Sequence, residues 1–232
     1  MKLGIIGENI EYTLSPKIHK KLLFEASIKG TYEIFDLLTL EELANQIQFL
    51  KKNGYTGVNI TKPYKIEILK YCDELDEVAD NIGSVNTLKF MPDGKIKGYN
   101  TDYIGFLNAF TPRQTTFLKG KNAIILGNGG ASKAVKFSLE KIGMNVIISH
   151  RQKEIDLTHI HLLVNTIPLN KISPINALCL REMPKFSIVY ELNCYQTKLL
   201  EDTAYFDLKI ICGLNMLNKQ AEESFKIWIV PS

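Results

Sequence analysis

The sequence predicts an α/β fold with two domains: an N-terminal domain with a mostly parallel sheet, and a second domain of the Rossmann type. Two observations support this prediction. In the first hundred residues strand-like segments alternate with helix-like segments, which is typical of parallel strands joined by right-handed crossover helices. Further along, an apolar strand at 122–126 leads through a glycine-rich turn into a helix that ends at Ile142, the order in which a Rossmann sheet begins.

The N-terminal domain is expected to begin with a strand at 2–7 and a helix that starts at Ser15, with Ser15 as its N-cap and Pro16 in its first turn. A capping box of Thr39 and Glu42 opens the next helix. The other expected elements are strands at 32–37, 55–60 and 84–91, a short strand ending near Asn100, and helices at 63–72 and 74–82. Helices between most of these strands agree with a mostly parallel sheet.

The second domain follows the polar stretch 111–121, which reads as a connection between domains. Its expected strands are 122–126, 145–149, 160–165, 186–192 and 208–212, and a last helix is expected at 215–228. The apolar strands separated by helices again predict a parallel sheet.

Composition and charge narrow the classes of protein. Of the 232 residues, 45% are hydrophobic and 23% are charged, an ordinary globular balance. The net charge is +3 with lysines spread along the chain, so we expect no nucleic-acid partner. No apolar run approaches the roughly 18 to 20 residues of a membrane span, and the N-terminus is unlike a signal peptide. Four scattered cysteines and an unpartnered His159/His161 pair predict neither disulfides nor a metal site, and favour a soluble cytoplasmic protein.

The turn G-N-G-G-A-S at 127–132 is typical of dinucleotide binding when it joins a strand to a helix. Gly127 permits the tight turn and Gly129 lets backbone approach a pyrophosphate at the helix N-terminus. Ser132 stands where a third glycine often sits, and glycines kept for packing are the alternative. Arg151 lies where an NAD site would carry an acid. Because a guanidinium can hold a 2′-phosphate, the sequence favours NADP, unless Arg151 is simply part of a solvated loop.

Four polar clusters interrupt the apolar pattern of the N-terminal domain. T-L-S-P at 13–16 places two hydroxyls at a helix start, which suits a carboxylate ligand. N-I-T-K-P-Y-K at 59–65 follows a strand, S-V-N-T at 84–87 sets an amide into an apolar strand, and N-T-D at 100–102 closes another. Taken singly, the clusters at 13–16 and 100–102 could be explained by helix capping and the one at 59–65 by a solvated loop, and capping would be favoured for an isolated Asp102.

In this order, the four clusters, the turn at 127–132 and a late G-L-N-M-L…Q-A at 213–221 resemble the shikimate dehydrogenase family over nearly the whole chain. The resemblance implies a substrate domain at 1–103 and 213–232, a Rossmann NADP-binding domain at 104–212, and an active-site cleft between them. It also implies NADP-dependent interconversion of 3-dehydroshikimate and shikimate, in the pathway to chorismate and the aromatic amino acids. A monomer or a homodimer is expected.

The same resemblance assigns roles to individual residues. Lys65 and Asp102 would be the catalytic pair, with Lys65 either the acid–base group or an electrostatic stabiliser, and Lys62 solvated. The residues implied in substrate binding are Thr13 and Ser15 for the carboxylate, and Asn59, Thr61, Asn86 and Gln220 for the ring hydroxyls. The residues implied in cofactor binding are Gly127, Asn128, Gly129, Gly130, Ala131, His150, Arg151 and Gly213.

The sequence departs from the family pattern at several places. Thr13 replaces a usual serine, and the segment 190–195 alters the usual position of a tyrosine, so a quinate/shikimate dehydrogenase with relaxed substrate or cofactor use is one alternative. The stretch 151–164 is much shorter than the family norm and predicts a trimmed cofactor domain. A non-catalytic regulator that binds NADP or another ligand on the same fold is a second alternative, although the presence of both Lys65 and Asp102 argues against it.

Overall fold

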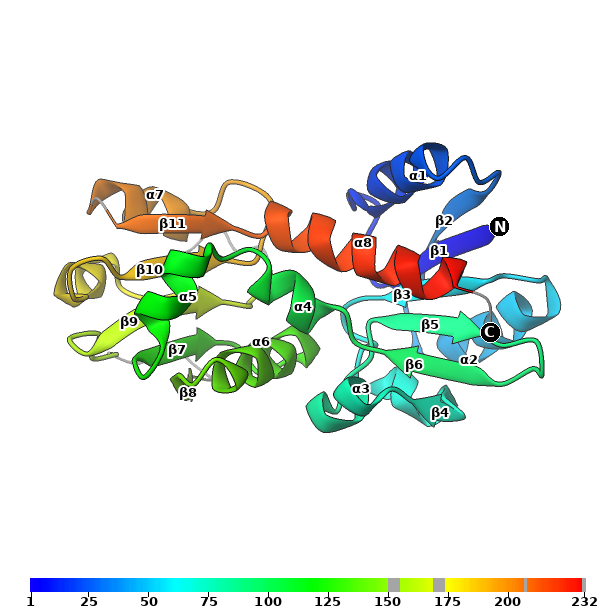
Figure 1. Ribbon diagram of the computed structural model, residues 1–232, viewed down its shortest axis with the longest axis horizontal. Helices are drawn as coiled ribbons and strands as arrows, with labels where there is room; N and C mark the ends of the chain where they lie inside the picture. Colours follow the sequence, from blue (N-terminus) through cyan, green and yellow to red (C-terminus); the bar gives the residue numbers. More distant parts are fainter. Residues whose placement is uncertain (150–154, 169–173, 207, 231–232) are drawn as a thin grey trace. The chain divides into compact units, whose positions relative to one another are not determined.

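The chain forms two compact units, each built around one sheet (Figure 1), which confirms the α/β class. The computed structural model describes residues 1–149, 155–168, 174–206 and 208–230. Unit 1 consists of Met1–Asp102 and Gln220–Ser232, and unit 2 of Tyr103–Lys219. The last helix, α8 (Leu214–Ile229), therefore belongs partly to each unit. Within the described ranges, none of the helices combines the length and the apolar character that a membrane crossing requires.

Unit 1 contains a mixed six-stranded sheet in the order β2-β1-β3-β5-β6-β4. Its strands are β1 (Lys2–Gly7), β2 (Thr31–Asp36), β3 (Gly57–Ile60), β4 (Glu74–Leu75), β5 (Thr87–Phe90) and β6 (Ile96–Tyr99). β1 runs parallel to β2 and β3, and β4 parallel to β6, whereas β5 runs antiparallel to β3 and β6. Its other helical elements are α1 (Ser15–Glu25), α2 (Leu40–Lys52), α3 (Glu77–Ile82) and the 3-10 helix η1 (Glu67–Tyr71).

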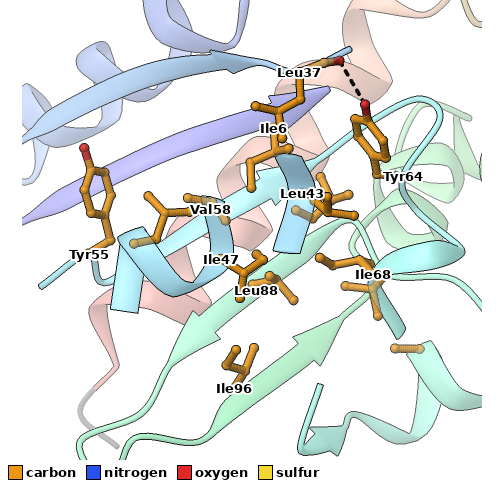
Figure 2. Packing of buried hydrophobic residues seen from close by; sticks show 14 residues of the cluster. Ile6, Leu37, Leu43, Ile47, Tyr55, Val58, Tyr64, Ile68, Leu88 and Ile96 are labelled. Atoms are coloured by element: carbon orange, nitrogen blue, oxygen red, sulfur yellow. Dashed lines mark hydrogen bonds between the residues drawn. The ribbon is translucent and has the colours of Figure 1, made fainter. Parts of the chain in front are cut away.

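One face of this sheet packs against α2 and η1. Alternate strand residues such as Ile6 and Val58 point to this face and pack against the two helices. Figure 2 shows this cluster from close by, with Leu43 and Ile47 of α2 over the strands. The Tyr64 hydroxyl donates to the Leu37 carbonyl oxygen at 2.9 Å, so the segment after β3 is tied to the segment after β2. This hydrogen bond fixes the segments that follow the C-terminal ends of β2 and β3 relative to each other.

The opposite face is covered by α1 and by α8, whose sequence is more than a hundred residues away from the strands that it contacts. The Trp228 indole N–H donates to the Leu88 carbonyl oxygen at 2.9 Å. A Cβ on Gly57 would lie 2.2 Å from the Trp228 Nε1, so only glycine allows this approach. The buried Lys89 donates through Nζ to the carbonyl oxygens of Ile227 and Val230, which satisfies carbonyls at the end of α8.

Unit 2 contains an all-parallel five-stranded sheet in the order β11-β10-β9-β7-β8. Its strands are β7 (Asn122–Leu126), β8 (Asn145–Ser149), β9 (Ile160–Asn165), β10 (Ile188–Glu191) and β11 (Lys209–Cys212). Its helices are α4 (Asp102–Leu107), α5 (Pro112–Leu118), α6 (Gly130–Lys141), η2 (Ala177–Glu182) and α7 (Lys198–Tyr205). Residues such as Ile125 pack against α4, α5 and α6, and neighbours such as Ile124 pack against η2 and α7. The sheet is thus covered on both faces, as parallel sheets are.

Two predictions about helix starts are wrong. Pro63 does not begin a helix: the Lys62–Pro63 peptide is cis, a turn follows, and the next helical turns are those of η1. Tyr64 is buried in the core of unit 1, and this packing outweighs the helix preference of the sequence after Pro63. Ser15 lies inside α1 rather than capping it, because Leu14 takes the N-cap position and provides no side-chain hydrogen bond.

The predicted capping box also differs from the structure. Thr39 does cap α2 by accepting from the Glu42 amide, but the Glu42 carboxylate accepts from the amide of Leu38 and so does not close a box with Thr39. The complete capping box of the chain's described helices instead opens α5, formed by Thr111 and Gln114. The stretch predicted as a connection at 111–121 is therefore mostly helix.

His19 gives a test of the core of unit 1. The ring is fully buried, stacks on Tyr32 at a centroid distance of 4.4 Å, and lies 5.3 Å from the Trp228 ring. Burial lowers its pKa to about 3, although the nearby Asn59 side chain partly offsets this effect. Because the folded-state pKa is below the ordinary value of 6.5, the unfolded chain binds a proton that the folded protein does not as the pH falls from 6.5 toward 3.

We therefore expect His19 to lower the free energy of unfolding by roughly 1.4 kcal/mol for each pH unit below about 6. Urea unfolding of the wild type and of His19→Phe between pH 7.5 and 5 measures this contribution. The phenylalanine ring keeps the stacking but cannot bind a proton, so the variant should lose less stability on acidification. An identical pH slope in both proteins would contradict the assignment.

Candidate active site

The centre of the candidate site is a short, poorly hydrated ion pair in unit 1. The Lys65 Nζ lies 2.6 Å from the Asp102 Oδ2, and the two side chains are only 15% and 5% exposed. Lys65 stands in the turn that follows β3, where its carbonyl oxygen accepts from the Val85 amide. Asp102 opens α4, and its amide donates to the Asn100 side chain. The backbone hydrogen bond to Val85 thus fixes the position of Lys65, and its ammonium lies beside the nearly buried Asp102 carboxylate.

Asn86 holds the other oxygen of the same carboxylate. Its Nδ2 donates to the Asp102 Oδ1 and to the Thr101 Oγ1, both at 2.9 Å, and to the Gln220 Oε1 at 3.2 Å. Its Oδ1 accepts from the amide of Thr101 at 2.8 Å. Both oxygens of Asp102 therefore have a donor, and a buried carboxylate satisfied in this way has a fixed orientation toward Lys65.

Asn59 is turned inward rather than toward solvent, and it is only 5% exposed. Its Nδ2 donates to the Asn86 carbonyl oxygen, to the Thr87 hydroxyl and to the Ser224 hydroxyl at 3.0–3.2 Å. Its Oδ1 accepts from the Tyr32 hydroxyl at 2.8 Å. Since both amide protons have acceptors inside the protein, Asn59 supports the neighbouring groups more directly than it offers donors to a ligand.

Thr13 and Ser15 form a hydroxyl pair at the start of α1. The Thr13 Oγ1 donates to the Ser15 Oγ at 3.1 Å and accepts from the Ser15 amide at 3.3 Å. The N-cap residue of this eleven-residue helix, Leu14, contributes no side-chain cap, and the hydroxyl pair lies at the positive end of the helix dipole. The arrangement suits an anionic group such as a carboxylate. Thr61, which follows β3, is half-buried beside Gly7.

The two lysines of N-I-T-K-P-Y-K differ in surroundings. Lys65 is paired with Asp102, whereas the Lys62 Nζ lies 5.6 Å above the ring of Tyr12 and the Lys62 side chain is half-buried. A lysine above an aromatic ring is held by cation–π attraction, and no carboxylate lies in ion-pair contact with it among the described residues. Lys62, predicted to be solvated, is thus partly exposed and partly packed on Tyr12, and it is not the lysine that pairs with Asp102.

In unit 2 the glycine-rich turn at 127–132 joins β7 to α6. Gly127 has φ +109°, and a Cβ there would lie 2.5 Å from the Thr166 Oγ1. The Ser132 hydroxyl closes the turn by donating to the Gly127 carbonyl oxygen at 2.8 Å, which explains a serine at the third glycine position. A Cβ on Gly129 would meet nothing within 4 Å, and Gly129, the N-cap residue of α6, contributes no side-chain cap.

These features fit a pyrophosphate, which needs open space before a helix N-terminus and closely approaching backbone. Asn128 and Gly129 are exposed, and Gly130 and Ala131 form the first turn of α6. Gly213 lies directly after β11, where a Cβ would lie 1.9 Å from the Leu192 carbonyl oxygen, so this position requires glycine. The predicted contacts of His150 and Arg151 lie outside the described residues.

Several supporting residues were missed in the sequence. Thr87, Thr101 and Ser224 connect Asn59 to Asn86 through buried hydrogen bonds, and Tyr32 donates to the Asn59 Oδ1. Ser224 carried a signal, because it is a polar residue on the face of a helix that otherwise buries Ala221, Phe225 and Trp228. Tyr32 in β2, Thr87 in β5 and Thr101 after β6 are common residue types whose partners depend on how the strands of unit 1 pair. In unit 2, the fully buried Glu191 accepts from Asn165, Asn193 and Thr197, which ties together the segment after β10.

Comparisons with known proteins find relatives that match nearly the whole chain. Residues 5–88 match the family described as "Shikimate dehydrogenase substrate binding domain". A shikimate dehydrogenase (NADP(+)) of Methanocaldococcus jannaschii is 35% identical over 260 aligned positions, which cover 97% of this chain and 90% of that protein. The crystal structure of shikimate dehydrogenase 1 from Peptoclostridium difficile has a TM-score of 0.88 at 32% identity, with 100% of this chain and 92% of that chain covered. Shikimate 5-dehydrogenase from Thermus thermophilus, solved with NADP(H) and shikimate, has a TM-score of 0.84 at 28% identity, with coverages of 100% and 95%.

The two glycines of the turn give a test of how it is built. Gly127→Ala should lower the free energy of unfolding by about 1–3 kcal/mol, because a side chain at this positive φ is strained and would contact Thr166. Gly129→Ala should change it by less than about 0.5 kcal/mol, since the new methyl group meets nothing. Thermal and urea unfolding of the two variants measure the difference, and equal losses would contradict the described loop.

Proposed function

The chain belongs to the shikimate dehydrogenase family, and we propose that it catalyses the reversible, NADPH-dependent reduction of 3-dehydroshikimate to shikimate. The observation that carries the proposal is the Lys65–Asp102 pair, held at 2.6 Å in a poorly hydrated part of unit 1. The full-length similarity to NADP-dependent relatives supports the choice of substrate and cofactor. The proposed reaction supplies shikimate for the synthesis of chorismate and the aromatic amino acids.

Reduction of a ring ketone requires a proton at the oxygen as the carbon is reduced. When bound, NADPH supplies the hydride. Lys65 is the group in unit 1 best placed to meet the developing negative charge on that oxygen, either by giving up a proton or by holding the charge through a hydrogen bond. Asp102 orients the Lys65 ammonium, and Asn86 in turn orients Asp102. In the reverse direction, the same pair receives the proton of the shikimate hydroxyl.

The remaining substrate groups are assigned by their chemistry. Thr13 and Ser15, at the N-terminus of α1, would hold the carboxylate of the substrate. Thr61 and Gln220 would contact its ring hydroxyls, together with Asn59 and Asn86. Because the amide protons of both asparagines already serve internal acceptors, we expect these two residues to contribute mainly by orientation.

The nucleotide is assigned to unit 2. The open turn at 127–131 would hold the pyrophosphate of NADP. Gly213, whose backbone packs closely against Leu192, is assigned to the cofactor site as well. Arg151 is assigned to binding of the adenosine 2′-phosphate, and His150 to binding of the cofactor. Accordingly the substrate domain is proposed at 1–103 and 213–232 and the NADP domain at 104–212. Cytoplasmic location and a monomeric or homodimeric state stay predictions from the sequence.

The proposal predicts that removing the charge of Lys65 lowers kcat, whereas removing the charge of Lys62 does not. Lys65→Met keeps the length of the side chain but removes the ammonium, so kcat for 3-dehydroshikimate reduction should fall about 10²-fold or more. Lys62→Met is the matched control. It removes the same charge three residues earlier in the chain, from the side chain that packs on Tyr12. Its kcat should stay within a factor of about three of the wild type, because Asp102 is paired with Lys65 and not with Lys62.

Both variants are assayed by NADPH oxidation at saturating substrate, and their folding is checked by thermal unfolding. Full turnover by Lys65→Met would contradict the assignment of the pair. A wild-type protein that binds NADPH but turns over neither shikimate nor quinate would favour the non-catalytic regulator. Quinate turnover comparable with that of shikimate would instead favour the relaxed quinate/shikimate dehydrogenase.

Arg151 tests the choice of cofactor. Arg151→Ala should raise KM for NADP about tenfold or more, because charge-assisted hydrogen bonds to a phosphate contribute roughly 1.5–3 kcal/mol. KM for NAD serves as the internal control and should change little, since NAD has no 2′-phosphate. Steady-state kinetics with each cofactor measure both values. Equal changes would mean that the 2′-phosphate is recognised by other residues.

A further inference from the structure

Ser224 occupies an unusual position in α8. It is completely buried on the helix face that also buries Ala221, Phe225 and Trp228. A serine at a core position of a helix usually returns its hydroxyl to its own backbone, and the Ser224 Oγ does lie 2.9 Å from the Gln220 carbonyl oxygen. It also meets three polar groups of the sheet, which a purely local role does not require.

The first of these groups is the Asn59 side chain. The Asn59 Nδ2 donates to the Ser224 Oγ at 3.0 Å, while the Asn59 Oδ1 accepts from the Tyr32 hydroxyl at 2.8 Å. The carboxamide therefore lies between an acceptor on one side and a donor on the other. This pairing distinguishes the two ends of the amide and fixes its orientation.

The other two groups are hydroxyls that lead to the ion pair. The Ser224 Oγ lies 2.8 Å from the Thr87 Oγ1 and 3.0 Å from the Thr101 Oγ1. The Thr101 Oγ1 accepts from the Asn86 Nδ2, which also donates to Asp102. Ser224 is thus joined to the Asp102 carboxylate through Thr101 and Asn86. The same hydroxyl also contacts the Asn59 side chain.

We propose that Ser224 is a positioning residue for the reaction proposed above: its hydroxyl fixes the Asn59 carboxamide and, through Thr101 and Asn86, the direction of Asp102 toward Lys65. The inference rests on the proposed function, because its effect is read as turnover. Ser224 itself need not touch the substrate. With alanine in its place, Asn59 loses one acceptor and the two threonine hydroxyls lose a shared partner. The carboxylate and ammonium are then held less tightly in the reactive geometry.

The matched control is Ser138 in unit 2. Like Ser224, it is completely buried in a helix and donates to the carbonyl oxygen four residues earlier, here Ala134 at 2.7 Å. Its other partner is the Tyr103 carbonyl oxygen, at 3.2 Å. Ser138→Ala and Ser224→Ala therefore remove the same kind of buried hydroxyl, but only Ser224 contacts the network around Asp102.

The experiment compares the wild type, Ser224→Ala and Ser138→Ala in NADPH oxidation with 3-dehydroshikimate. Both variants should show a similar decrease in Tm. Only Ser224→Ala should lower kcat, by about tenfold, since a small displacement of reacting groups is sufficient for such a loss. KM for NADPH should be unchanged in both, because neither hydroxyl belongs to the nucleotide turn.

A kcat of Ser224→Ala within twofold of the Ser138→Ala value would overturn the inference and leave Ser224 with a structural role only. If Ser224→Ala does not fold, Tyr32→Phe decides, because it removes the donor at the opposite end of the Asn59 carboxamide and keeps the ring stacked on His19. Its kcat should also fall about tenfold, and an unchanged kcat would overturn the inference. Absence of wild-type turnover would overturn the proposed function itself. An active wild type together with an equally active Ser224→Ala would overturn only the role of Ser224.

Discussion

A carboxylate that hardly meets water is stable only when donors occupy its oxygens, and this requirement at Asp102 organises unit 1. Lys65 supplies one donor and Asn86 the other. The two donors come from the ends of different strands, Lys65 from the segment after β3 and Asn86 from the segment before β5. β3 returns the chain to Lys65 through a tight turn, and the antiparallel pairing of β5 with β6 places Asn86 opposite the segment that ends in Asp102. The mixed sheet is thus the arrangement that brings an amine and an amide to one carboxylate.

The same requirement explains why the end of the chain returns to unit 1. Gln220 and Ser224 complete the polar network around Asn86 and Asn59, and they do so from a helix that must approach the sheet closely. Close approach depends on Gly57, which leaves room for Trp228, and on Lys89, which satisfies the last carbonyls of α8. Apolar packing on this face therefore supports a polar function, since the network is aligned only while α8 stays in place.

Much of this could be predicted from the sequence, and the failures have identifiable physical causes. Alternating apolar segments predicted both sheets, and the order of polar motifs singled out Lys65, Asp102 and Asn86 together. The inward orientation of Asn59 could not be predicted, because it depends on Tyr32 and Ser224, which are distant in sequence. Pro63 was misread as a helix start because local propensity was outweighed by the burial of Tyr64. Ser15 was misread as a cap because a hydroxyl before a helix and a hydroxyl in its first turn look alike in sequence.

The central claim is that Lys65 and Asp102 act as one unit on the substrate oxygen at which negative charge develops. A double-mutant cycle tests this most directly, with kcat measured for Lys65→Met, Asp102→Asn and the combined variant. If the two residues act as a unit, the combined variant should lose little more activity than the more damaging single change, because either change already disables the pair. Losses that simply multiply would contradict the account, since they would mean that the two side chains contribute independently.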